Sequence, residues 1–255
     1  MPLQISVVTA VFNRAGTVAE ALQSVRAQTW PNVEHIVIDG GSTDGTLDIL
    51  KAHRSRLATL ISEPDAGIYD ALNKGIRQAT GDVVGFMHAD DLFASPLTLA
   101  RVAAEFEDPD VGAVYGDLVY VGKDASRIIR YWRAGPFSRE RLAQGWMPPH
   151  PTFYLRRELY EKLGLFDTRY RIAADYESML RILGRGGVKP AYVPHILVRM
   201  RWGGVSNSSL RNMLIKSTED YTAMRQNGMG GLVALLRKNV AKLPQFMVRA
   251  PDTGL

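Results

Sequence analysis

Apolar residues in the first 92 positions follow two alternating patterns. Four short, β-branched runs predict buried strands, at residues 3–11, 33–38, 57–61 and 83–87. Three segments between them carry apolar side chains at helical spacing, at residues 17–28, 46–53 and 68–79. Strand and helix that alternate in this way predict a doubly wound, mostly parallel α/β sheet flanked by helices.

The order of elements loosens after residue 92. Helices are expected at residues 96–107, 156–163, 173–183, 208–226 and 231–243, and strands at residues 111–115, 152–155 and 191–200. A hairpin is expected across residues 122–124, and residues 135–151, rich in Gly, Pro and Arg, are expected to form a loop over the site. We predict one domain over residues 1–205 and a basic helical appendage at residues 206–255.

Composition indicates a globular protein and excludes several kinds of site and segment. The chain has 255 residues, 46% hydrophobic and 22% charged, proportions that allow a sizeable core. It has no cysteine, which excludes disulfides and thiolate metal sites and fits a reducing compartment such as the cytoplasm. The N-terminus lacks the basic start of a signal peptide, and no apolar run reaches the roughly 18 residues of a membrane span.

Positive charge gathers at the C-terminal end. The formal net charge is +5, whereas residues 196–255 hold nine Lys or Arg against three acids, a net charge of +6. A basic end implies an anionic partner, and a membrane surface, a nucleic acid and a phosphorylated substrate all fit.

Two adjacent carboxylates, Asp90 and Asp91, follow the predicted strand at residues 83–87. Ligands of open α/β sheets bind beyond the carboxyl ends of the strands. Two hard oxygen ligands at that place suit Mg²⁺ or Mn²⁺ holding a phosphate. The alternative interpretation is a polar cap on the following helix, which Ser95-Pro96 would help to begin.

The common nucleotide-binding loops do not fit the glycine-rich stretch from Gly40 to Gly45. Ser42 stands where the fingerprint G-x-G-x-x-G has its second glycine, and Thr46 stands where a P-loop has lysine. A dehydrogenase or an ATPase is therefore disfavoured. Acids nevertheless follow several predicted strand ends, at Asp39, Asp65, Asp70, Asp90 and Asp91.

Further motifs appear in a fixed order along residues 4–205. They are Ser6-Val-Val-Thr-Ala-Val-Phe-Asn13, Val37-Ile-Asp39-Gly-Gly-Ser-Thr-Asp44-Gly45, Ser62-Glu-Pro-Asp65-Ala-Gly-Ile-Tyr-Asp70-Ala-Leu-Asn73-Lys74-Gly75, Ala79-Thr-Gly81-Asp82, His88-Ala-Asp90-Asp91, His150-Pro-Thr-Phe153, and Gly164-Leu-Phe-Asp167 leading to Ala174-Asp175-Tyr-Glu177. Their order and spacing resemble those of the family-2 glycosyltransferases. The resemblance implies a GT-A fold, with a donor half at about residues 1–92 and an acceptor half at about 93–205. It also implies inverting, metal-dependent transfer from a nucleotide-diphosphate sugar, with UDP, GDP or dTDP as the carrier.

The resemblance also implies roles for single residues. Asp39 would lie against the nucleobase, which suits uracil or guanine because both offer an N–H to a carboxylate. The other residues placed at the donor are Thr9, Val11, Asn13, Asp70, Lys74, His88 and Asp90. Asp90 and Asp91 would hold Mg²⁺ or Mn²⁺ on the diphosphate. His88 stands where the family's D-x-D pattern has its first acid, so which carboxylate is the main metal ligand stays open.

An inverting transfer needs a general base for the acceptor hydroxyl, and the candidate is Asp175. On a helix that begins near residue 173, Asp175 shares the face of Met179 and Ile182, whereas Glu177 points elsewhere and is expected to be a solvated surface acid. A carboxylate on an apolar face is costly unless it faces a cavity or a partner. The alternative is that Asp175 only stabilises the helix dipole.

Three further residues have two interpretations each. His150 contacts the diphosphate or the acceptor, or is a turn histidine; Lys74 neutralises phosphate, or is a solvated helix lysine. Trp202 begins a segment, Trp202-Gly-Gly-Val-Ser206, that resembles the lid near the acceptor in relatives. The processive signature Gln-x-x-Arg-Trp is absent because Val198 replaces its Gln, which favours transfer of a single sugar.

The last predicted helix is amphipathic. Its apolar stripe is Leu232, Leu235, Leu236, Val240 and Leu243, flanked by Arg237, Lys238 and Lys242 and extended by Phe246 and Met247. The stripe packs on the domain or lies on an anionic bilayer at the cytoplasmic membrane face. We expect a saccharide or lipid-linked saccharide acceptor and no nucleic acid partner. The alternatives are a sugar-phosphate nucleotidyltransferase and an inactive sugar-nucleotide-binding relative.

Overall fold

The computed structural model describes residues 2–203, 210–240 and 245. The strands are β1 (Ile5–Val11), β2 (Val33–Asp39), β3 (Thr59–Ser62), β4 (Val83–Phe86), β5 (Leu92–Phe93), β6 (Ala113–Val121), β7 (Ile128–Trp132), β8 (Tyr154–Arg156) and β9 (Pro190–Arg201). The helices are α1 (Val18–Arg26), α2 (Thr46–Ala52), α3 (Ile68–Gln78), α4 (Thr98–Glu105), α5 (Arg139–Ala143), α6 (Arg157–Leu163), α7 (Ala174–Met179), α8 (Leu210–Gln226) and α9 (Leu232–Val240).

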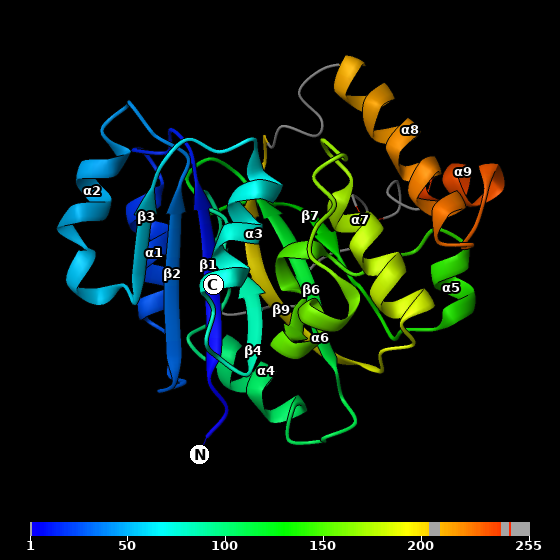
Figure 1. Ribbon diagram of the computed structural model, residues 1–255, viewed down its shortest axis with the longest axis horizontal. Coiled ribbons are helices and arrows are strands. Elements are labelled where there is room, and N and C mark those ends of the chain that lie inside the picture. Colours follow the sequence, from blue (N-terminus) through cyan, green and yellow to red (C-terminus); the bar gives the residue numbers. More distant parts are fainter. Residues whose placement is uncertain (1, 204–209, 241–244, 246–255) are drawn as a thin grey trace.

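The described strands form one mixed, nine-stranded sheet in the order β3-β2-β1-β4-β8-β6-β9-β5, with β7 paired to β6 (Figure 1). All pairings among β1, β2, β3 and β4 are parallel. The chain leaves β1 in one direction to form β2 and β3 and then returns to the other side of β1 to form β4. The order therefore reverses between β1 and β4, and open α/β sheets bind ligands beyond the strand ends at such a point.

The second half of the sheet departs from parallel winding. β8 lies antiparallel between β4 and β6, and the predicted hairpin joins β6 to β7. β9 runs parallel to β6, and the short β5 pairs with the end of β9. The predicted doubly wound α/β class is confirmed, with antiparallel strands added at β5, β7 and β8.

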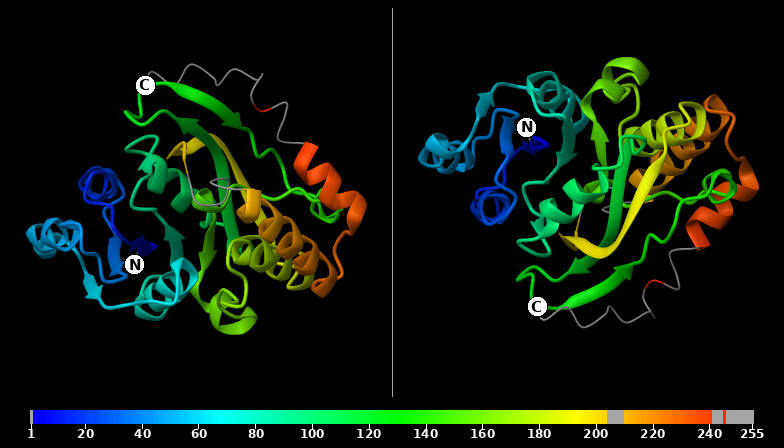
Figure 2. Two further views of the ribbon diagram at one scale, coloured as in Figure 1. Left: turned by 90° about the horizontal axis from the view of Figure 1, so that it is seen from above. Right: turned by 90° about the horizontal axis from the view of Figure 1, so that it is seen from below.

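Helices cover both faces of the sheet. One apolar cluster joins β1, β2 and β4 to α3, α7, α8 and α9, while α1, α2 and α4 contribute to clusters on the other face. Figure 1 is viewed onto the face of the sheet that α3, α6 and α7 cover. Figure 2 shows the molecule from above and from below, so that the helices on the two sides of the sheet can be told apart. A Cβ on Gly75 of α3 would collide with Val8 of β1. Glycine thus lets α3 approach β1 closely.

The expectation that Glu177 is a solvated surface acid is wrong. Glu177 is 6% exposed and pairs with Arg181 at 3.0 Å, because α8 covers the helix face that the sequence left to solvent. In α9, Leu232, Leu236 and Val240 of the apolar stripe are exposed and Leu235 packs partly buried against the core, whereas Lys238, expected beside the stripe, is buried. The predicted helix at 173–183 is also irregular, since a π-helical turn, Leu180–Arg185, follows α7.

Some of the expected elements fall outside the residues that the structure describes. Leu243, Lys242, Phe246, Met247 and the segment 204–206 of the predicted lid lie outside the part of the chain that the structure describes. The division of the chain at residue 205 stays a prediction. None of the described helices is both long and apolar enough to cross a membrane.

Candidate active site

The two acids after β4 lie in a tight turn at the point where the strand order reverses. The N–H of Asp91 donates to the carbonyl of His88 at 3.0 Å. Asp91 is 1% exposed; its Oδ1 accepts the N–H of Arg201 at 3.2 Å, and its Oδ2 has no hydrogen-bond partner among the described residues. Asp90 is more open and lies 3.6 Å from the guanidinium Nε of Arg14. One carboxylate is therefore buried and half-satisfied, and the other reaches solvent.

The electrostatics of this turn fit a cation. Burial, and then the charge of Asp90, raise the pKa of Asp91 well above its ordinary value, while Arg201 lowers it. An unpaired buried carboxylate beside a second one is costly. A divalent ion would give Asp91 Oδ2 its missing partner. No group of three or more His, Asp or Glu that could hold a metal occurs among the described residues, so two carboxylates would share the ion with water and substrate phosphate, as Mg²⁺ sites commonly do.

Arg201, at the end of β9, holds the acidic turn and was missed by the sequence analysis. Its Nη1 donates to the carbonyl of Asp90 at 2.9 Å, its Nε donates to the carbonyl of Lys123 at 3.0 Å, and it forms an ion pair with Glu20. The sequence places Arg201 next to Trp202 of the predicted lid segment, but this neighbour does not identify its partners. Nothing in the local pattern indicates that its partners lie 110 residues earlier.

Asp175 occupies the first turn of α7 and is half-buried. Its Oδ1 accepts the N–H of Tyr176 at 2.8 Å and lies 3.3 Å from the hydroxyl of Tyr69. That hydroxyl donates to the carbonyl of Ile172 at 2.6 Å. Burial, and then the charge of Asp175, raise the pKa of Tyr69 well above its ordinary value, so the phenol keeps its proton. No hydrogen bond to Asp175 Oδ2 occurs in the described part of the chain, which leaves this oxygen able to accept a proton.

Two histidines lie between the acidic turn and Asp175. The rings of His88 and His150 are 5.8 Å apart, and His150 stacks on Phe86 at 5.3 Å. Burial lowers the pKa of His150 to about 4, although Asp175 opposes this effect, and its Nε2 has no partner among the described residues. Burial also lowers the pKa of His88, against the charges of Asp90 and Asp175. The structure thus brings Asp90, His88, His150 and Asp175 together, with both imidazoles neutral near pH 7.

The residues predicted to line the nucleoside hold two loops together. Asp39 is fully buried at the end of β2 and accepts hydrogen bonds from the hydroxyls of Ser42 and Ser62. Asn13, at a positive φ of 50°, accepts the N–H of Thr43 at 2.9 Å. The loops after β1 and β2 therefore form one hydrogen-bonded unit beside the strand ends.

The remaining predicted site residues differ in burial and in the contacts that they already make. Thr9 is fully buried with its hydroxyl 3.0 Å from His35, and Val11 packs in the core. The ammonium of Lys74 lies 2.8 Å from Glu63, 3.0 Å from the carbonyl of Pro64 and 3.7 Å from Asp70. Lys74 is thus committed to the loop before α3. Trp202 is 42% exposed, with its ring edge against Tyr120 at 5.6 Å.

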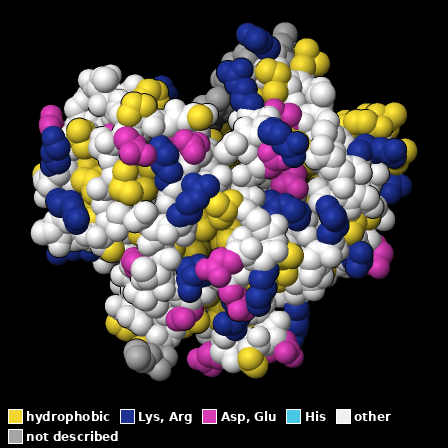
Figure 3. All heavy atoms as spheres, in the orientation of Figure 1, with side chains coloured by type: hydrophobic (Ala, Val, Ile, Leu, Met, Phe, Trp, Pro, Cys, Tyr) yellow, Lys and Arg dark blue, Asp and Glu magenta, His cyan; other side chains and the backbone are white. Residues whose placement is uncertain are grey.

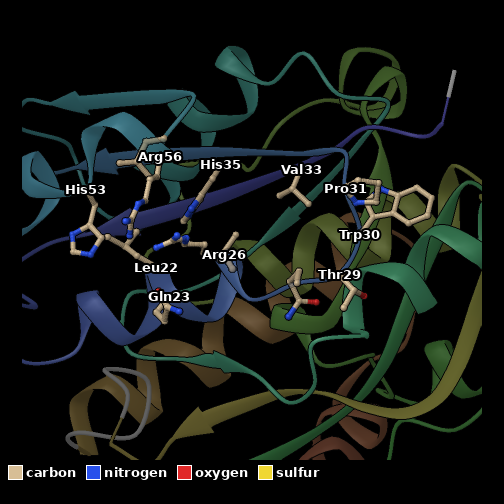
Figure 4. A pocket seen from close by; sticks show the side chains of 13 residues that line it. Leu22, Gln23, Arg26, Thr29, Trp30, Pro31, Val33, His35, His53 and Arg56 are labelled. Carbon is tan, nitrogen blue, oxygen red and sulfur yellow. The ribbon is translucent and has the colours of Figure 1, made fainter.

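The surface of the molecule has an indentation and a separate cavity. Figure 3 shows an indentation at its upper edge, between the lobe built on β1–β3 and the lobe that carries α8. A different cavity, of about 310 Å³, lies between α1 and the end of α2, near Arg26, His53 and Arg56 (Figure 4). It is lined by Val33, the first residue of β2, and so lies at the opposite end of that strand from Asp39.

Comparison with known sequences settles the class of protein. The sequence model described as Glycosyl transferase family 2 matches residues 6–173, more than half of the chain. The chain belongs to glycosyl transferase family 2. A relative described as "PGL/p-HBAD biosynthesis glycosyltransferase" from Mycobacterium tuberculosis is 31% identical over 251 residues, which are 95% of this chain and 93% of the relative. An uncharacterized glycosyltransferase of the same species is 38% identical over 183 residues, 69% of this chain and 68% of the relative.

Solved structures share the fold. S. aureus TarS 1-349 in complex with UDP-GlcNAc superposes with a TM-score of 0.66 at 19% identity, over 88% of this chain and 65% of that chain. The present chain therefore spans less than two thirds of that neighbour. Glucosyl-3-phosphoglycerate synthase from Mycobacterium tuberculosis has a TM-score of 0.63 at 20% identity, over 89% of this chain and 81% of its own. Mannosyltransferase PcManGT from Pyrobaculum calidifontis has a TM-score of 0.63 at 21% identity, over 100% of this chain and 78% of its own. The predictions of a GT-A-type fold and of a glycosyltransferase are confirmed.

Burial of His150 predicts a pH dependence of stability. The folded protein resists protonation of this imidazole until about pH 4, whereas an unfolded histidine binds a proton below about pH 6.5. The stabilising contribution is therefore complete above about pH 6.5 and is lost as the pH falls towards 4, by about 3 kcal/mol. Urea unfolding between pH 4 and 8 should show this slope reduced in His150→Gln. The matched control is His195→Gln, which replaces an exposed histidine and should keep the wild-type slope; equal slopes in both variants would contradict the assignment.

Proposed function

We propose that this glycosyltransferase moves one sugar from a nucleotide-diphosphate donor to an acceptor hydroxyl, with inversion and with Mg²⁺ or Mn²⁺. The observation that carries the proposal is the buried, unpartnered Asp91 Oδ2 beside Asp90, at the point where the strand order reverses. Structural neighbours support it by their bound ligands. TarS 1-349 was solved with UDP-GlcNAc, glucosyl-3-phosphoglycerate synthase with Mn²⁺ and UDP, and PcManGT with GDP-Man and Mn²⁺.

The donor would lie along the ends of β1, β2 and β4. Asp39 and Asn13 belong to the hydrogen-bonded loops after β1 and β2, where the nucleoside would bind. Asp90 and Asp91 would hold the ion, which when bound neutralises charge on the departing diphosphate. A UDP- or GDP-linked sugar suits Asp39, because uracil and guanine both offer an N–H to a carboxylate.

Asp175 would act as the general base. The acceptor oxygen forms its bond to the anomeric carbon while the bond from that carbon to the diphosphate oxygen breaks. The hydroxyl proton moves to Asp175, whose Oδ1 is engaged by Tyr176 and Tyr69 and whose Oδ2 stays open. His150 and His88, both neutral, would offer hydrogen bonds between donor and acceptor, and Trp202 would line the acceptor side.

The ion site is tested by thermal unfolding with UDP, GDP, dTDP and their sugars, each with and without Mn²⁺. We expect one nucleotide to stabilise the wild type only with Mn²⁺, and the double variant Asp90→Ala/Asp91→Ala to lose this shift because its carboxylate ligands are gone. The matched control is Asp82→Ala, which removes the acid before the opposite end of β4 and should keep the shift. A stabilisation that ignores Mn²⁺ would remove the ion from the mechanism.

The base is tested by the variant Asp175→Asn. We expect release of the nucleoside diphosphate to slow by about 10²- to 10⁴-fold, with the Mn²⁺-dependent nucleotide shift unchanged. Glu177→Gln is the control, because Glu177 lies on the same helix and pairs with Arg181; it should lower the melting temperature more than the rate. A fully active Asp175→Asn would contradict the assignment, and release of pyrophosphate from nucleoside triphosphates would indicate a nucleotidyltransferase.

We further propose that α9 contacts an anionic bilayer, where a lipid-linked saccharide would be reached from the cytoplasmic face. Its outward face exposes four apolar side chains to 61–67%: Leu232, Val233, Leu236 and Val240. Met213 and Leu214 of α8 are also exposed, at 52% and 71%. Figure 3 shows hydrophobic and basic side chains side by side over both helices.

The charge around this surface supports an anionic partner. Arg211, Arg225 and Arg237 are exposed on α8 and α9. The two acids of these helices are engaged internally, since Glu219 accepts backbone N–H groups and Asp220 is buried against Lys238 at 2.7 Å. The exposed charges of α8 and α9 are therefore all positive, which suits anionic lipid beneath the apolar side chains.

Sedimentation with vesicles tests this contact. Wild type should bind vesicles that contain phosphatidylglycerol more than pure phosphatidylcholine vesicles, and Leu232→Ser/Leu236→Ser/Val240→Ser should bind at least about tenfold more weakly because apolar burial is lost. The control Leu97→Ser/Ile129→Ser removes exposed apolar side chains from other elements and should bind like wild type. Unchanged binding of the triple variant, or concentration-dependent self-association in place of binding, would contradict the proposal.

A further inference from the structure

Helix α8 contacts the segment that leads into the helix of Asp175. Glu219, half-buried on α8, accepts hydrogen bonds from three successive backbone N–H groups. Its Oε1 accepts from Arg171 at 2.8 Å, and its Oε2 accepts from Ile172 at 2.8 Å and Ala173 at 2.9 Å. The last of these donors is two positions before Asp175.

These N–H groups precede a helix that has no side-chain cap of its own. The residue before α7 is Ala173, whose side chain cannot accept a hydrogen bond. Helix starts leave N–H groups unsatisfied, and an oxygen from the cap residue commonly accepts one of them. Here a carboxylate from 46–48 residues away accepts the N–H of the cap residue Ala173 and those of the two residues before it, through charge-assisted bonds that are stronger than neutral ones.

Tyr69 of α3 holds the same segment from the other side. Its hydroxyl donates to the carbonyl of Ile172 at 2.6 Å, with Asp175 Oδ1 3.3 Å away. Glu219 therefore fixes the N–H side and Tyr69 fixes the carbonyl side of one short stretch of backbone. Two elements far apart in sequence thus set where α7 begins and where the Asp175 carboxylate lies.

We propose that Glu219 is a positioning residue for Asp175. It holds the backbone of Arg171, Ile172 and Ala173 so that the carboxylate of Asp175 meets the acceptor hydroxyl at the right distance. The proposal rests on the proposed role of Asp175 as the base. Glu219 lies beyond residues 6–173, which the family model matches, so the family pattern assigns it no role.

Docking of α8 does not depend on Glu219 alone. The hydroxyl of Tyr170 donates to Gln226 Oε1 at 2.6 Å, and Asn227, just after α8, contacts Glu177 at 3.4 Å. Gln226→Ala therefore removes one contact between α8 and the same loop while it leaves the three N–H bonds of Glu219 intact. This variant separates loss of docking from loss of positioning.

Backbone amide exchange gives a readout that needs no substrate. In Glu219→Ala, the amides of Arg171, Ile172 and Ala173 lose their acceptors and should exchange about tenfold faster or more. Gln226→Ala should lower the melting temperature without this change. Equal exchange at these amides in wild type and Glu219→Ala would contradict the described contacts.

Kinetics then test the link to chemistry, by release of the nucleoside diphosphate from the donor that the thermal panel selects. We expect kcat of Glu219→Ala to fall about 10- to 10²-fold, because a small displacement of a catalytic group costs this much, with KM for the donor unchanged. Glu219→Gln should be intermediate, since its amide oxygen can still accept from Ile172 and Ala173. A kcat of Glu219→Ala equal to that of Gln226→Ala would show a merely structural role.

A double-variant cycle separates this proposal from the proposed function. If Glu219 acts through Asp175, adding Glu219→Ala to Asp175→Asn should cause no further loss of kcat. Multiplied losses would contradict positioning through Asp175. A fully active Asp175→Asn would instead overturn the choice of base, and faster amide exchange in Glu219→Ala would still stand as a separate finding.

Discussion

The buried oxygen of Asp91 is the constraint on which the candidate site depends. Two adjacent carboxylates, one of them 1% exposed and half-satisfied, oppose folding in the absence of a cation. The turn that holds them is therefore secured from elsewhere. The backbone N–H of Arg201 reaches Asp91 and its guanidinium reaches the carbonyl of Asp90. β9 can provide both contacts because it pairs with β5, which directly follows the turn.

The site is assembled from two internally bonded units that face each other across the end of β4. In the first unit, Asp39, Ser42 and Asn13 join the loops after β1 and β2. In the second unit, Glu219 and Tyr69 fix the start of α7. Each unit is held by short hydrogen bonds that do not involve the open oxygens of Asp91 and Asp175. Groups held in this way need little reorganisation when substrate binds, which is the usual basis of electrostatic catalysis.

The sequence predicted the features that have a local signature. Parallel strands buried on both faces give β-branched runs, so β1, β2 and β4 were found, and acids directly after such strands marked Asp39, Asp90 and Asp91. The two-residue β5 has no periodicity to detect. No local sequence pattern indicates the roles of Arg201 and Glu219, because their partners lie about 110 and 46–48 residues away. Glu177 was misread for a related reason: helical spacing gives the direction of a side chain but not whether α8 packs there.

The orientation of α9 buries a charged side chain and exposes apolar ones, which is unfavourable for an isolated protein in water. The helix turns Lys238 inward, onto Asp220 and over the ring of Tyr176 at 3.0 Å, and leaves Leu232, Leu236 and Val240 in solvent. Burying those three side chains instead would contribute about 1.5–3 kcal/mol each. A buried ion pair seldom offsets that much, because desolvation cancels most of its attraction. This cost is removed if a partner covers the outer face of α9 in the functional state of the protein. The exposed arginines beside that face favour an anionic surface as this partner.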